Sequence, residues 1–387
     1  MILIIPFLIT IIFVIIIIIY TSSIPSINNS KLSVFSEGNQ YLNTFSPIVK
    51  ELIKRKIHFN YYTLDNDDEL LDLKNEYFNP YFLGVGILGH LRFKKISTEN
   101  LLSTTPNIGN KKFPLKRPKK VDNLIHVWHS ISDIGYYRKG SLDNYDTILN
   151  VGQFQNKSIE AIKKIRKTNI QKLIPVGLPY YDQFVKKIKQ DDSSTKSILI
   201  GSSWGNKGLL KNHGYRILDI LKDRKIIIRP HPQSFFSEKK FIENFKAKCD
   251  SMQNVEWDDS NNPLDSFRNA SILISDTSSI RYDFSFLTLK PVITLKINNN
   301  YLQEYECNHL KERWDERTEK ILGTVIHEDN ISTLSKEIDI LLSRVHENNL
   351  IQKLKENTLF SIGNSSKNIV DYIISIINDK DNVNKQK

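Results

Sequence analysis

The sequence has few cysteines and lacks the motifs by which several common enzyme classes are identified. Only two cysteines, Cys249 and Cys307, occur in 387 residues, so at most one disulfide can form. This is more typical of a protein in a reducing compartment than of a disulfide-stapled secreted fold. No Cys and His spacing predicts zinc, and there is no Walker A loop, no Gly-x-Ser-x-Gly elbow and no G-x-G-x-x-G after a predicted strand. No cofactor is expected, and no cluster of metal ligands is visible.

The composition is that of an ordinary globular protein with an excess of positive charge. The apolar fraction is 40%, the charged fraction is 25% and the formal net charge is +11. Phosphates, polyanions and anionic lipid surfaces are therefore the expected partners. Nucleic acid is not predicted, because no helix-turn-helix, zinc-finger or aromatic RNA-binding signature is present.

The first twenty residues predict a single-pass transmembrane anchor. Met1–Tyr20 carries no charge, and about 20 apolar residues in a helix are enough to cross a bilayer. A cleaved signal peptide is the alternative, but no Lys or Arg precedes the run and no A-x-A site follows it. The nearest basic residues all follow the segment, which places the large domain in the cytoplasm: Lys31, Lys50, Lys54, Arg55 and Lys56.

Behind a short tether the chain alternates between strand-like and helix-like segments. The residues at 31–35, 57–64, 125–128 and 147–151 read as strands, and those at 46–56 and 158–168 as helices. After a polar stretch at 190–196 the alternation restarts, with strands at 197–200, 225–228, 271–274 and 291–295. Such alternation predicts parallel sheets with crossover helices, an α/β fold.

The most informative segment follows the apolar strand that ends at Ser275. Asp276, Thr277, Ser278 and Ser279 open the next helix, where unpaired backbone amides and the helix dipole favour a phosphate. An ordinary helix cap is the alternative. Asp283 lies four residues later on the same helix face, within reach of such a ligand or simply solvated.

Three other predicted strands end in polar turns. The strand at 226–228 leads to Arg229, which can hold phosphate, and to His231, which can move a proton; a structural histidine is the alternative. The strand at 125–128 leads to His129, a candidate general base for an acceptor hydroxyl. The strand at 197–200 leads to Gly201, Ser202, Ser203 and Trp204, a loop that suits a phosphate or a base.

Taken together, these segments resemble the CDP-glycerol glycerophosphotransferase family of teichoic-acid and capsule enzymes. The resemblance covers 31–294 and rests on the following motifs: SEGNQYLNTF at Ser36–Phe45, HVWHS around His129, GLPYYD at Gly177–Asp182, SSWG at Ser202–Gly205, RPHP at Arg229–Pro232, and SDTSSIRYDF at Ser275–Phe284 followed by Lys290 and Pro291. One departure is the turn Trp-His-Ser-Ile, where the family has Trp-His-Gly-Thr.

The resemblance implies a GT-B-like fold with the donor in the cleft between two Rossmann-like halves. The implied boundaries are an anchor at 1–20, a tether at 21–30, an acceptor half at 31–190, a donor half at 191–330, C-terminal helices at 331–378 and a polar tail at 379–387. His129 and His231 become the catalytic pair. The implied donor-binding residues are Arg229, Asp276, Thr277, Ser278, Ser279, Asp283, Ser203 and Trp204.

The implied reaction moves polyol phosphate from a CDP-activated donor to a hydroxyl of a lipid-linked or surface-glycan acceptor and releases CMP. Two alternatives stay open at this point. A GT-B sugar transferase with a nucleotide-sugar donor uses the same helix-terminus phosphate site, and a membrane-tethered binding protein can keep the fold without catalysis. The basic segments at 111–120 and 158–168 are additional candidates for contact with anionic lipid.

Overall fold

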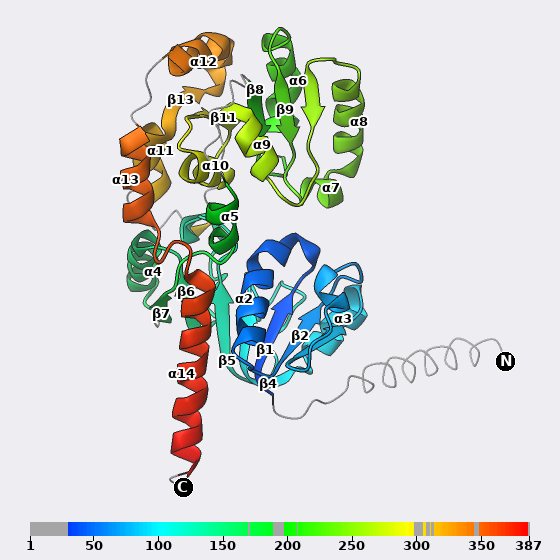
Figure 1. Cartoon of the computed structure of the whole chain (residues 1–387), viewed down its shortest axis with the longest axis vertical. Coiled ribbons are helices and arrows are strands. Elements are labelled where there is room, and N and C mark those ends of the chain that lie inside the picture. The colour runs from blue at the N-terminus through cyan, green and yellow to red at the C-terminus, as the bar shows by residue number, and fades with distance from the viewer. Residues whose placement is uncertain are drawn as a thin grey trace, which may run out of the picture.

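The structure is a computed structural model that describes residues 30–168, 171–188, 197–206, 208–297, 305–306, 310, 313–343 and 348–385. The predicted anchor at 1–20 and Cys307 lie outside the described residues. Across the ranges that are described, every helix is too short or too polar to cross a bilayer. The chain forms two α/β halves, one above the other in Figure 1.

The first half is built on a seven-stranded parallel sheet with the order β3-β2-β1-β4-β5-β6-β7. Its strands are β1 (Ser30–Ser36), β2 (Phe59–Thr63), β3 (Phe78–Phe82), β4 (Ser97–Ser103), β5 (Lys120–Val127), β6 (Thr147–Asn150) and β7 (Lys172–Pro175). Its helices are η1 (Asn39–Tyr41), α2 (Leu42–Lys54), η2 (Glu69–Asp72), α3 (Gly86–Phe93), η3 (Ile134–Tyr136), α4 (Gln153–Arg166) and α5 (Tyr181–Lys187). The central strands are apolar because helices cover both faces of the sheet.

The second half repeats this plan with a six-stranded parallel sheet of order β10-β9-β8-β11-β12-β13. The strands are β8 (Ser197–Gly201), β9 (Ile226–Arg229), β10 (Val255–Trp257), β11 (Ala270–Ser275), β12 (Val292–Lys296) and β13 (Gly323–His327). The helices are α6 (Leu209–Ile220), α7 (Ser234–Ser237), α8 (Lys239–Asp250), α9 (Leu264–Asn269), α10 (Ile280–Thr288), α11 (Trp314–Leu322), η6 (Glu328–Thr333) and α12 (Leu334–Ser343).

Both sheets contain a point at which the strand order reverses. In the first half it lies between β1 and β4, and in the second half between β8 and β11. Neighbouring loops at such a point leave the sheet in opposite directions, so a crevice forms at the carboxyl ends of the strands, where open α/β folds bind ligands. The loops after β8 and β11 are the two segments that carry Ser203, Trp204 and Thr277–Ser279.

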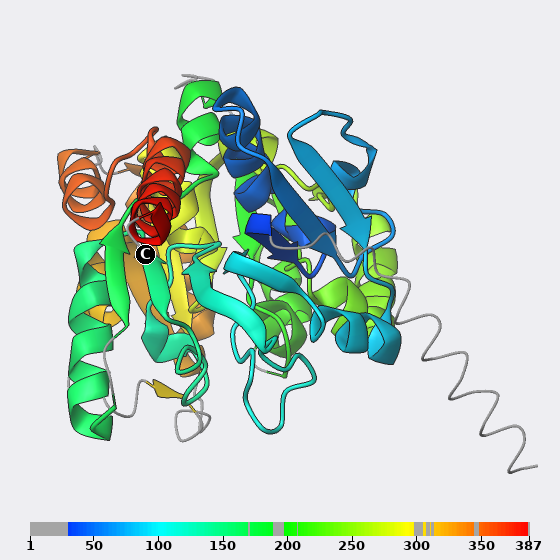
Figure 2. The same ribbon diagram turned by 90° about the horizontal axis from the view of Figure 1, so that it is seen from below.

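After α13 (Asn348–Thr358) the chain returns to the first half through α14 (Ser365–Lys385), the long helix that ends the chain in Figure 1. Ile369, Val370 and Ile373 of α14 join the core formed by α2 and the first sheet. In the view from below, α14 lies against the first half (Figure 2). Asp182 accepts hydrogen bonds from the amides of Ser365 at 2.8 Å and Ser366 at 2.7 Å, so the GLPYYD turn caps this helix.

An aromatic cluster joins the two halves. Trp314 of α11 stacks on Phe154 of α4 with ring centroids 4.1 Å apart, and it also packs on Tyr282 at 4.5 Å. These rings belong to one buried apolar cluster that includes residues of both sheets. Because large aromatic surfaces are buried there, the halves are packed against each other rather than joined only by a linker.

Two cations of the basic segment 158–168 are paired inside the protein. Lys163 of α4 is buried and pairs with Asp143 at 2.6 Å, while Arg166 pairs with Asp143 and, at 2.7 Å, with Glu306. These two cations are already neutralised inside the protein. They are therefore not available to bind lipid headgroups, although their neighbours on α4 remain exposed.

Candidate active site

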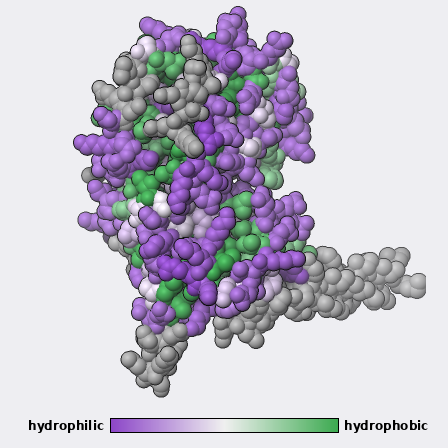
Figure 3. All heavy atoms as spheres, in the orientation of Figure 1, coloured by the Kyte–Doolittle hydropathy of each residue, from purple (hydrophilic) through white to green (hydrophobic). Residues whose placement is uncertain are grey.

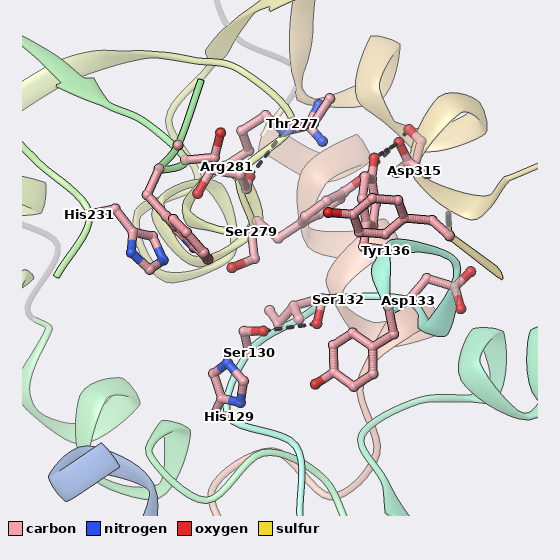
Figure 4. A pocket seen from close by; sticks show the side chains of 18 of the residues that line it. His129, Ser130, Ser132, Asp133, Tyr136, His231, Thr277, Ser279, Arg281 and Asp315 are labelled. Atoms are coloured by element: carbon pink, nitrogen blue, oxygen red, sulfur yellow. Dashed lines mark hydrogen bonds between the residues drawn. The ribbon is translucent and has the colours of Figure 1, made fainter. Parts of the chain in front are cut away.

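A cavity of about 770 Å³ lies between the two halves at the carboxyl ends of the strands. Figure 4 shows His129 at the bottom of the view and His231 above it, with Ser279 beside His231. The predicted site residues that line this cavity come from both halves: His129, Ser203, Trp204, His231, Thr277, Ser278 and Ser279. The predicted catalytic pair and five predicted donor-binding residues thus share one cavity, at the reversal point of the second sheet.

Asp276 holds the two loops of this reversal point together but does not line the cavity. Its buried carboxylate accepts hydrogen bonds from the Ser203 amide at 3.0 Å and the Ser203 hydroxyl at 2.8 Å. It also accepts from the amides of Leu209 at 2.8 Å and Ser278 at 2.9 Å. The sequence predicted Asp276 as a donor-binding residue; the structure instead makes it a residue that positions the loop after β8 against the start of α10.

The loop after β8 needs glycine at two positions. Gly205 has a φ of +87°, a left-handed conformation that other residues adopt at a cost. At Gly208 a Cβ would lie 2.4 Å from the carbonyl oxygen of Ser203, which no side chain tolerates. The tight turn leaves Trp204 49% exposed at the cavity wall, 6.4 Å from the ring of His231. The indole is thus available to stack on a planar ligand.

The start of α10 has unpaired donors where the main cavity meets a second one. Within the described part of the chain, the amides of Ser279 and Ile280 donate no hydrogen bond. Ser279 lines both cavities, and Ile280 lines the second. Arg281 is fully buried; it donates to the carbonyl of Ser278 at 3.1 Å and pairs with the buried Glu319 at 3.6 Å. Free amides at a helix start form an environment that favours an anion.

His129 follows β5 and is neutral at neutral pH. Burial lowers its pKa to about 4, because the protonated ring loses its hydration. Its buried Nδ1 has no partner among the described residues, and the Tyr41 ring lies edge-on at 5.1 Å. A neutral imidazole has a nitrogen with a free lone pair and can accept a proton.

His231 faces His129 from the second half and has a defined tautomer. Its pKa is lowered to about 4, first by burial and then by the nearby His129, with Glu238 opposing the effect. The Gln233 amide donates to Nδ1 at 3.0 Å, so in the neutral ring the proton sits on Nε2. His231 is therefore set up as a hydrogen-bond donor, which complements a proton-accepting His129.

Several cavity residues carry no motif and were missed from the sequence. Arg138 is exposed and lines the cavity, and its guanidinium has no ion-pair partner in the ranges described. Tyr136 donates a hydrogen bond to Asp315, which also pairs with Arg313 at 2.8 Å. Aligned relatives would be needed to find them, because a lone Arg or Tyr in a loop has no local signal.

Arg229 does not reach the main cavity. Its guanidinium pairs with Asp258 at 2.5 Å and donates to the Ser260 carbonyl at 2.7 Å. It lines a second cavity, of about 300 Å³, together with Ser278 and Ser279. The two predicted turns therefore converge on one cleft, but the Arg229 guanidinium is held by Asp258 and Ser260 at the second cavity, and its role as a phosphate ligand stays a prediction.

Asp283 also lines the second cavity and connects the halves. Tyr180 of the GLPYYD turn donates to its Oδ1 at 2.6 Å, and Tyr181 donates at 3.3 Å. Burial raises the pKa of Asp283 to about 7, although the two tyrosine hydrogen bonds oppose the rise. The sequence predicted Asp283 near the donor phosphates; in the structure it joins α10 to the first half.

Replacement of Asp283 by asparagine should change how stability depends on pH. The folded protein holds a proton on Asp283 up to about pH 7, whereas the unfolded chain releases it near pH 4. Wild type must therefore lose stability relative to Asp283→Asn as pH rises from 4 to 7. Each pKa unit corresponds to about 1.4 kcal/mol, so urea unfolding at pH 4.5 and 7.5 should show a difference of at least that size. If the substitution changed the free energy of unfolding equally at both pH values, Asp283 would be ionised in the folded protein at both.

Comparison with known proteins confirms the two-half α/β architecture. No family model matches the chain, and no curated protein matches it by sequence. Among solved structures it is similar to the wall teichoic acid polymerase TagF, with 14% identity, 90% of each chain covered and a TM-score of 0.57.

Two other solved structures have the same arrangement. The UDP-GlcNAc 2-epimerase of Methanocaldococcus jannaschii matches with 15% identity over 89% of this chain and all (100%) of that one, at a TM-score of 0.59. MurG of Acinetobacter baumannii matches with 10% identity, 89% and 100% coverage and a TM-score of 0.50. The chain therefore has a GT-B-like fold.

Proposed function

We propose that this protein transfers polyol phosphate from a CDP-activated donor, CDP-glycerol or a similar compound, to an acceptor hydroxyl in the synthesis of a cell-envelope polymer. The observation that carries the proposal is the pair His129 and His231, which face one cavity from opposite halves beside the free amides of α10. Similarity to TagF supports it, since one TagF variant was solved after a soak with CDPG.

The donor is proposed to lie along the main cavity. Its base stacks on the exposed indole of Trp204, and its phosphates accept a hydrogen bond from the amide of Ser279, which lines the main cavity. Arg138 supplies the cation that the sequence had assigned to Arg229. The hydroxyls of Thr277 and Ser278 line the same wall.

The reaction is a displacement at the β-phosphorus of the donor. The acceptor oxygen forms a bond to that phosphorus while the bond to the bridging oxygen breaks, and CMP leaves with that oxygen. His129 takes the hydroxyl proton, and Nε2–H of His231 donates a hydrogen bond to the phosphate oxygens as their charge grows. An anionic donor beside His129 raises the pKa of the imidazole, which makes it a stronger base when the substrate is bound.

A GT-B sugar transferase is the second candidate, because the epimerase with the same fold was solved with UDP-GlcNAc and UDP. One assay separates the two. We expect nucleotide release from CDP-glycerol or CDP-ribitol and none from a panel of UDP- and GDP-sugars. Release only from nucleotide sugars would replace the proposal by the second candidate, and failure of every CDP compound to bind would remove it.

The location of the enzyme is proposed from the sequence alone. The uncharged run at 1–20 is proposed as a single-pass anchor in the cell membrane that keeps the catalytic halves in the cytoplasm, where activated nucleotides are made. The acceptor is proposed to be lipid-linked or a surface glycan, so an anchor keeps the enzyme near its substrate. No role with nucleic acid is proposed.

A further inference from the structure

The second cavity meets the main cavity at the catalytic histidines. The two share His129, Ser130, His231, Ser278 and Ser279, so a molecule in the second cavity reaches His129 from the side opposite the bulk of the donor. In the space-filling view, the surface is hollowed between the halves on the side where α7 faces the first half (Figure 3). This cavity begins at the loop after β1, the reversal point of the first sheet.

None of the residues that line the second cavity supplies a free cation. His129 and His231 are neutral, because burial lowers each pKa to about 4. Arg229 is neutralised by Asp258 at 2.5 Å, and Asp283 accepts its hydrogen bonds from tyrosines. An anion placed there would lose its hydration without gaining a cation. The main cavity differs, since Arg138 lines it.

Side-chain amides and aromatic rings form about half of the remaining wall. The side-chain amides of Gln40, Gln233 and Asn261 form no hydrogen bond to any described residue. Gln40 comes from the first half, and Gln233 and Asn261 come from the second. Asn43 of α2, in the first half, donates to the Asn261 carbonyl at 2.9 Å. The apolar part includes the rings of Tyr41, Tyr180, Phe184 and Phe267. Ile280 and the prolines Pro230, Pro232 and Pro263 complete it.

We propose that the second cavity is the acceptor site and that it binds a neutral polyhydroxyl unit, a sugar ring or a polyol, rather than a phosphorylated one. Amides donate to and accept from hydroxyls equally well, and ring faces cover the apolar C–H surface of a sugar. The volume of about 300 Å³ is at the lower end for a small-molecule site, so it holds one terminal unit with its reacting hydroxyl at His129. This inference rests on the proposed function.

The test measures acceptor and donor binding separately in the full-length protein. Saturation-transfer NMR in the presence of saturating CMP should detect methyl glucoside, methyl N-acetylglucosaminide or ribitol, but not glucose 6-phosphate or glycerol 3-phosphate. The double variant Gln233→Ala and Asn261→Ala should weaken binding of the neutral probe by at least about tenfold, the loss expected for two hydrogen bonds, and leave the Kd for CMP unchanged.

Arg138→Gln serves as the matched control, because this residue lines the main cavity and not the second. It should weaken CMP binding and leave neutral-probe binding unchanged. Preference for the phosphorylated probes, or neutral-probe binding that the double variant does not alter, would overturn the inference while CMP binding still supports the donor site. Absence of CMP and CDP binding would instead remove the proposed function itself.

Discussion

Replacement of His129 by alanine should abolish nearly all CMP release while the donor still binds. General-base catalysis by a positioned side chain contributes about 10²- to 10⁴-fold, so kcat should fall by that factor. The Kd for CDP, measured by calorimetry, should not change, because the proposed donor contacts come from Trp204, Arg138 and the amide of Ser279. The imidazole is neutral before the donor binds, since its pKa is about 4, so wild type is ready to accept a proton at neutral pH.

His58→Ala is the matched control, since His58 is exposed and lies outside both cavities. It should retain full activity. If His129→Ala instead lost CDP affinity and kept its kcat, His129 would be a ligand of the donor and not the general base.

Replacement of Asp276 by alanine should destabilise the protein and weaken donor binding together. The carboxylate accepts from three backbone amides and one hydroxyl, and a buried donor left without a partner costs about 1–3 kcal/mol. We expect the free energy of unfolding in urea to fall by roughly 3 kcal/mol or more. Because the loop with Trp204 then loses its link to α10, the Kd for CDP should rise as well.

Asp265→Ala provides the comparison, because Asp265 is 80% exposed and pairs only with Arg268 at the surface. Its removal should cost at most about 1 kcal/mol and leave CDP binding intact. Normal stability combined with lost CDP binding in Asp276→Ala would show that Asp276 contacts the donor directly, as the sequence had predicted.

With the exception of β4, the strands that the sequence predicted lie inside the sheets and those that it missed lie at the edges. The apolar runs that form β8, β9, β11 and β12 were all predicted, because parallel strands inside a sheet are covered on both faces. The central strand β4 was missed because its sequence, Ser-Thr-Glu-Asn-Leu-Leu-Ser at Ser97–Ser103, is mostly polar. The other missed strands, β3, β7, β10 and β13, are the four edge strands. An edge strand is less enclosed and can hold polar residues or a proline, such as Pro80 in β3, so its sequence lacks the apolar signal.

The candidate site divides in a similar way. Polar residues that follow a buried strand can be recognised locally, which is why His129, His231 and Ser279 were predicted. Whether such a residue faces the cavity depends on partners that are distant in the chain. Asp258 forms an ion pair with Arg229, and the amides of Ser203 and Leu209 donate hydrogen bonds to Asp276. Neither contact can be recognised from the sequence around these residues.

The sequence by itself determined the local chemistry of this protein: apolar strands that end in His, Ser and Asp turns, and an uncharged run at its start. Only the tertiary structure decided which of those turns meet. The two sheets had to pack through Trp314 and Phe154 before His129 and His231 faced one cavity. Packing between distant segments is a property of complementary surfaces, and a linear pattern of residue types does not encode it in any single segment.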